Sequence, residues 1–263
     1  MAFKIGIETG MLPGGYTAAL DHFSQLQTMF PLTSAELQTE SSLYAAHYTP
    51  KNRKVPDVEI LGVHLPFMDL DPFSGSGERR RNSRNILFST IQQASDIDAD
   101  YVVFHARAPG PVNRGDVWAP LLSELAETSE DSGMKFCLEN ADDLYDIGTI
   151  HRLLHELPEI NLCLDIGHLY EHTFTLFTRY LPLLFDRRLA ETLRQLEDHI
   201  QCLHIHNHNG FMAHQVLTGG KIDLSPVRQM SCREIPLILE PDYRGMGNDA
   251  IERDICFLEK LIL

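Results

Sequence analysis

The chain has 263 residues, 43% of them hydrophobic, and carries a formal net charge of −15 at pH 7. This length supports a complete core, and the negative charge disfavours general nucleic-acid binding because phosphate backbones are repelled. The five cysteines include no Cys-x-x-Cys pair, which predicts reduced thiols and not a disulfide framework. No apolar run is long enough for a membrane span and no signal-peptide pattern is present, so we expect a cytoplasmic protein and not a membrane protein.

Short apolar segments alternate with helical segments along the chain. The predicted strands are 3–8, 35–38, 60–65, 101–105, 135–139, 161–166, 202–206 and 235–240. Apolar residues at helical spacing predict helices over 17–30, 84–94, 117–128, 187–199 and 251–261. Most of these segments are near-continuously apolar, although 35–38 is a weak strand, and their alternation with helices indicates parallel βαβ units. The fold predicted for residues 1–263 is therefore α/β, a single-domain (β/α)8 TIM barrel.

Two further segments have simple interpretations. The apolar segment 174–185, FTLFTRYLPLLF, lies in the widest gap between predicted strands. We favour ordinary core packing for it over an extra helix, a lid or an interface. The basic segment 77–84, GERRRNSR, follows the third strand, and we interpret it as the solvated start of a helix and not as a phosphate site.

Metal-capable side chains end six consecutive predicted strands. They are His64, His105, Glu139, Asp165 with His168 just beyond it, His204 with His206, and Glu240. In a parallel barrel these strand ends meet at one mouth, where active sites lie. Any one of them alone is more often a helix cap or a satisfied polar group than a ligand, but six together are costly without a cation. Their nitrogen and oxygen donors predict a site for Mn²⁺, Zn²⁺, Mg²⁺ or Co²⁺.

Four of the 13 histidines fall within the eleven residues from His204 to His214. Strand alternation predicts that His204 and His206 share one face, and that Asn207 to Gly210 form the turn that ends the strand.

The segments VHLPF, VVFHA, CLEN, LDIGH, LHIHNHNG and LILE resemble the xylose-isomerase-like barrel superfamily, which includes sugar isomerases and epimerases and the AP-endonuclease family 2 proteins. The resemblance extends over nearly the whole chain. It implies a divalent cation held by Glu139, Asp165, His204 and Glu240. It also implies that His168 binds substrate or a further metal.

The leading hypothesis is a metal-dependent isomerase or epimerase that acts on a small sugar or polyol-type substrate through an enediolate. Glu139 and Glu240 would be the acid/base pair on the two faces of the substrate, and His168 would orient a substrate oxygen. His206 would hold a ligand in place or contact substrate. Whether His64 and His105 bind metal or substrate stays open.

A zinc-dependent phosphodiester hydrolase of the AP-endonuclease type is the alternative. His64 and His105 are similar to the first-metal histidines of that branch, and His214 to a third-metal ligand. The Asp expected two residues before His214 is Met212, a poor ligand for a hard cation. A non-catalytic binding barrel is a further alternative. We expect a sugar-like small molecule as the binding partner, and we expect no nucleic-acid or membrane partner. A homo-oligomer is possible for this chain.

Overall fold

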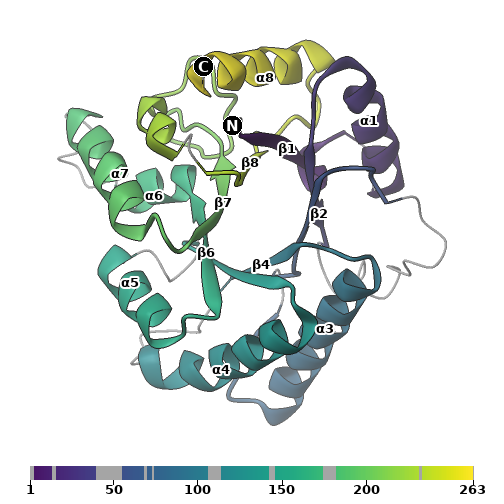
Figure 1. The fold of residues 1–263 in the computed structure, drawn as a ribbon, viewed down its shortest axis with the longest axis vertical. Coiled ribbons are helices and arrows are strands. Elements are labelled where there is room, and N and C mark those ends of the chain that lie inside the picture. Colours follow the sequence, from purple (N-terminus) through teal and green to yellow (C-terminus); the bar gives the residue numbers. More distant parts are fainter. Residues whose placement is uncertain are drawn as a thin grey trace. The chain divides into compact units, whose positions relative to one another are not determined.

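The computed structural model describes residues 3–13, 16–39, 55–67, 70–72, 74–105, 114–141, 146–173, 182–230 and 233–262. Eight strands follow one another in chain order as a closed parallel barrel, which confirms the predicted fold class (Figure 1). The strands are β1 (Lys4–Glu8), β2 (Ser34–Gln38), β3 (Ile60–His64), β4 (Tyr101–His105), β5 (Lys135–Glu139), β6 (Ile160–Asp165), β7 (Ile200–Ile205) and β8 (Pro236–Leu239). Each lies within two residues of a predicted strand.

Helices separate the strands. They are α1 (Tyr16–Met29), α3 (Gly77–Asp96), α4 (Arg114–Ser132), α5 (Ile147–Glu156), α6 (Ile166–Thr173), α7 (Pro182–Leu196) and α8 (Asn248–Ile262), with 3-10 turns η1 (Thr9–Met11) and η4 (Ser225–Met230). All five predicted helices are present. The basic segment 77–84 opens α3, which Ser76 caps by accepting the Arg79 backbone N–H, so the interpretation as a helix start is confirmed. Of the apolar segment, residues 174–181 lie outside the described residues.

Two helices were missed from the sequence. In α5, the Asp146 carboxylate accepts the Thr149 backbone N–H at 2.8 Å, and Ile150, Leu153 and Leu154 are buried. This capping residue followed by apolar residues at helical spacing was a readable signal. By contrast, α6 begins at the residue directly after the end of β6, so no turn or loop sequence separates the two elements.

The chain forms two compact units. The first comprises Met1–Ala35, Val58–Ile60 and Cys163–Leu263, and the second comprises Glu36–Asp57 and Leu61–Leu162. In the first unit β8 pairs with both β1 and β7, and in the second β4 pairs with both β3 and β5. The expectation of one domain stays a prediction.

The strands carry mostly buried side chains, as strands covered on both faces should. In the second unit, the fully buried Tyr101 donates a hydrogen bond to Glu36 Oε2 at 2.9 Å. Its ring lies where a Cβ on Gly62 would be, only 2.2 Å from Tyr101 Cζ. The packing of this ring therefore favours glycine at position 62. Across the described residues, no helix has the length and apolar character needed to cross a membrane.

Candidate metal and acid–base centre

The junction of β6 and α6 positions Asp165. One carboxylate oxygen, Oδ1, accepts the backbone N–H of His168 and thereby caps the first turn of α6. The other, Oδ2, lies 3.1 Å from His206 Nε2, and both side chains are fully buried. A carboxylate oxygen and an imidazole nitrogen at this distance could both be ligands of one cation.

A glycine makes this approach possible. A Cβ on Gly167 would lie 1.8 Å from His206 Cε1, far inside any carbon–carbon contact. The LDIGH segment thus supplies the carboxylate at Asp165, the space at Gly167 and a histidine at His168 within four residues.

Three histidines surround this junction. The rings of His206 and His214 stack with centroids 4.1 Å apart, and His168 meets each edge to face at 5.6 Å. One ring nitrogen from each lies within 4.8 Å of the others. Such a group of imidazoles can supply several ligands to one cation.

The hydrogen bonds orient the imidazole rings. His206 Nδ1 lies 2.9 Å from the backbone nitrogen of His214 and 3.2 Å from the Asn207 carbonyl oxygen. The tautomer that donates from Nδ1 to this carbonyl keeps its lone pair on Nε2, which lies 3.1 Å from Asp165 Oδ2. His214 Nδ1 lies 3.0 Å from the Glu240 carbonyl oxygen, which can only accept, so the neutral ring keeps its lone pair on Nε2. Burial lowers the pKa of His214 to about 4, with the neighbouring His206 acting in the same direction. His214 is therefore neutral at physiological pH, the form that binds metal.

The loop after β7 holds His214 in place. Asn207 and Gln215 form an antiparallel bridge, and Asn209 Oδ1 accepts the backbone N–H groups of Phe211 and Met212. His214 itself has a φ of 52°, a left-handed conformation that few side chains adopt without such constraint. Met212 is 63% exposed at the tip of this turn, so it adds no ligand here.

His204 has a different partner. Its Nδ1 lies 2.9 Å from Glu240 Oε1, and both side chains are buried. Burial raises the pKa of Glu240 well above its usual range; His204 opposes this, whereas the carboxylates of Glu8 and Asp165 add to it. Glu8, fully buried at the end of β1, was missed from the sequence, although it ends its strand as the six predicted residues end theirs.

The second unit carries its own group. Glu139 Oε2 lies 2.9 Å from His105 Nε2 and 3.2 Å from His64 Nε2, and His105 is directly opposite Glu139 in the β4–β5 register. Phe67 stacks on His105 with centroids 4.2 Å apart. His64 Nδ1 lies 3.0 Å from the Leu65 carbonyl oxygen, so the neutral ring would direct a lone pair at a carboxylate. A proton or a cation is needed to make that contact favourable.

The structure thus brings the predicted residues together in three sets. In the first unit these are Asp165 with His168, His206 and His214, and separately His204 with Glu240; in the second unit they are His64 with His105 and Glu139. His206, expected to hold a ligand in place, is the residue that faces Asp165, whereas His204, expected to be the ligand, faces Glu240. That Glu139 joins Asp165, His204 and Glu240 around one cation stays a prediction.

Sequence comparison identifies a family and relatives for this chain. The model of the xylose isomerase-like TIM barrel family matches residues 49–261. One uncharacterized protein of Methanocaldococcus jannaschii is 29% identical over 191 residues, which are 63% of this chain and 59% of that protein. Another from the same organism is 26% identical over 175 residues, 62% of each chain. The matched part spans less than two thirds of these relatives.

Solved structures agree over nearly the whole chain. A D-tagatose 3-epimerase-like protein has a TM-score of 0.73 at 21% identity, covering 99% of this chain and 97% of that one. A Thermus thermophilus protein soaked with zinc chloride has a TM-score of 0.69 at 21% identity, covering 99% and 98%. An L-ribulose 3-epimerase has a TM-score of 0.72 at 15% identity, covering 99% and 94%. At these identities the similarity establishes the fold alone.

Proposed function

Because the chain belongs to the xylose isomerase-like TIM barrel family, we propose that it is a divalent-metal-dependent isomerase or epimerase acting on a small sugar or polyol-type substrate. The observation that carries the proposal is the contact of Asp165 with His206, surrounded by His168 and His214. The ketose 3-epimerases among the solved structures of the same fold support the choice of substrate class.

The donors in the first unit fit a cation of intermediate hardness. Asp165 and His206 would hold it, and His168 and His214 lie within reach to complete the set. Imidazole-rich donors favour Zn²⁺ or Co²⁺ over Mg²⁺ and Mn²⁺, which prefer oxygen ligands. Bound there, the cation would polarise a substrate carbonyl and acidify the adjacent C–H.

The acid/base work falls to two glutamates in this proposal. Burial raises the pKa of the Glu240 carboxyl, which strengthens it as a base that takes a proton from the substrate and returns it. His204, 2.9 Å away, orients its carboxylate. Glu139, oriented by two imidazoles, is the predicted group for the other face. His168, whose side chain is 21% exposed, would orient a substrate oxygen.

The test is proton exchange with solvent. Metal-loaded protein is incubated with ketohexoses and ketopentoses in D2O, and deuterium incorporation is followed by NMR. Glu139→Gln and Glu240→Gln should each lower the rate by about 10²–10⁴-fold while the fold survives. Glu130→Gln, exposed on α4, is the matched control. Full activity in either active-site variant would overturn the assignment, and activity that survives complete metal removal would overturn the metal dependence.

A phosphodiester hydrolase remains the second candidate because of the His64–His105–Glu139 group, which would make a second metal site. Two or three zinc ions per chain, with metal-dependent cleavage of an abasic-site duplex, would favour it. The exposed Met212 and the net charge of −15 count against it. A non-catalytic barrel would be favoured if metal fails to bind. The cytoplasmic location, the absence of nucleic-acid partners and a homo-oligomer stay predictions.

A further inference from the structure

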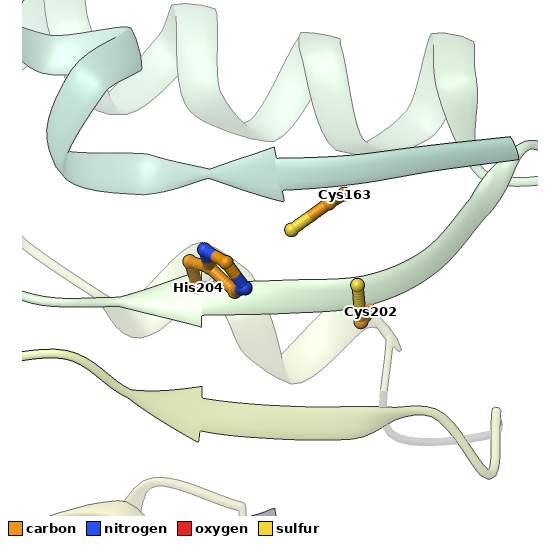
Figure 2. A group of neighbouring side chains, drawn as sticks. All are labelled: Cys163, Cys202 and His204. Carbon is orange, nitrogen blue, oxygen red and sulfur yellow. The ribbon is translucent and has the colours of Figure 1, made fainter. Parts of the chain in front are cut away.

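Two cysteines in the first unit lie outside the chemistry proposed above. Cys163 on β6 projects toward the strand that carries Cys202 and His204, β7 (Figure 2). All three side chains are fully buried. The two sulfur atoms and one ring nitrogen of His204 lie within 4.8 Å of one another.

We propose that Cys163, Cys202 and His204 form a second, thiolate-rich metal site for a thiophilic divalent cation, with Zn²⁺ as the fitting ion. This site is separate from the Asp165–His206 centre and does not depend on the epimerase proposal. Two thiolates and an imidazole select Zn²⁺ over Mg²⁺ or Ca²⁺, which prefer oxygen.

The spacing is close to what coordination needs. With Zn–S bonds of about 2.3 Å and Zn–N bonds of about 2.0–2.1 Å, tetrahedral geometry places the sulfurs about 3.8 Å apart and each about 3.6 Å from the nitrogen. Atoms at most 4.8 Å apart need to close by at most about 1.2 Å to reach those distances. Rotation of the cysteine side chains can supply movement of that size.

The charge balance also fits a buried site. On binding, both thiol protons leave to solvent, and two thiolates, a neutral imidazole and a divalent cation sum to zero. The cation and its three ligands thus carry no net charge together, which lowers the cost of burying them. His204 Nδ1 faces Glu240 Oε1 at 2.9 Å, so Nε2 is the coordinating nitrogen and Glu240 the carboxylate that orients it.

The site has a structural consequence. Cys163 precedes Asp165 by two residues, and His204 precedes His206 by two residues, so each pair shares a strand face. A cation bound by Cys163, Cys202 and His204 would link β6 to β7 two residues before the Asp165–His206 contact on each strand. It would therefore stabilise the strand register on which that contact depends.

Cobalt distinguishes the two sites because only one contains sulfur. Reduced, metal-free protein is titrated with Co²⁺, and the thiolate-to-cobalt charge-transfer band in the near ultraviolet is recorded, followed by displacement with Zn²⁺. The band should appear in the wild type and in Asp165→Asn, which disables only the first centre. It should disappear in Cys163→Ser and Cys202→Ser, and Glu240→Gln should weaken Zn²⁺ binding about 10–100-fold.

Two controls isolate the effect. Cys137→Ser changes an equally buried strand cysteine in the second unit, and Cys256→Ser removes a partly exposed thiol on α8; both should keep the band. If a serine variant does not fold, Cys163→Ala and Cys202→Ala replace it. The proposal would be overturned if wild-type protein whose thiols are shown to be reduced gave no thiolate band, or if the band persisted without Cys163 or Cys202. A Cys163–Cys202 disulfide in the reduced preparation would also overturn it.

Discussion

Gly167→Ala should displace the His206 imidazole and uncouple it from Asp165. The added Cβ would lie 1.8 Å from Cε1, 2.2 Å from Nδ1 and 2.4 Å from Nε2 of His206. Carbon atoms in contact prefer about 3.5–4.0 Å, so the ring has to move by about 2 Å. The backbone φ of Gly167 lies outside the left-handed region, so alanine meets no conformational penalty and the clash alone decides the outcome.

The expected effects are separable. Overpacking of this kind costs about 1–3 kcal/mol of the free energy of unfolding. Loss of an outer-shell partner lowers metal affinity or activity about 10–100-fold, so displacing His206, a proposed ligand, should lower them by at least that much. Urea unfolding measures the first effect, and metal titration with the exchange assay measures the second.

Gly77→Ala is the matched control. Gly77 is also a helical glycine, but nothing lies within 4 Å of its would-be Cβ. This substitution should leave metal binding unchanged and alter stability by no more than about 1 kcal/mol, in the stabilising direction. Equal metal affinity in Gly167→Ala and Gly77→Ala would refute the reasoning, because it would mean that the His206 position does not govern the site.

Three further outcomes follow from buried contacts. The pKa of His214 is about 4 in the folded metal-free protein, against an ordinary value of 6.5, so the stabilisation from keeping this ring neutral is fully present above pH 6.5 and is lost as the pH falls toward 4. The free energy of unfolding should therefore fall by about 2 kcal/mol between pH 7 and pH 5. Urea unfolding of His214→Asn should show a smaller loss over the same range, and an equal loss would contradict this assignment. Tyr243→Phe removes the hydroxyl that donates to Asp254 Oδ2 at 2.9 Å in a buried pair, and should cost about 1.5–3 kcal/mol in denaturant unfolding with activity retained; a change below about 0.5 kcal/mol would count against the bond. Gly62→Ala would place a Cβ 2.2 Å from Tyr101 Cζ and should cost about 1–3 kcal/mol by thermal or chemical unfolding, so an unchanged midpoint would show that the ring can yield.

Sequence alone was sufficient for the architecture because barrel strands are buried on both faces. Continuous apolar runs such as 101–105 and 135–139 mark such strands directly, and the structure has β4 and β5 with those same bounds. The metal-capable residues were also visible, since each stands at the end of an apolar run. Their number and position, without any distance, were enough to predict a polar centre.

The pairing of these residues was decided only by tertiary structure. His204 and His206 are two residues apart and chemically identical, yet one faces Glu240 and the other faces Asp165. Strand register, the space left by Gly167 and the loop that carries His214 decide which carboxylate each ring meets, and all three depend on contacts between segments distant in sequence. The approach of Cys163 to Cys202 has the same origin: 39 positions separate them along the chain, and only the folding of β6 and β7 brings their sulfur atoms together.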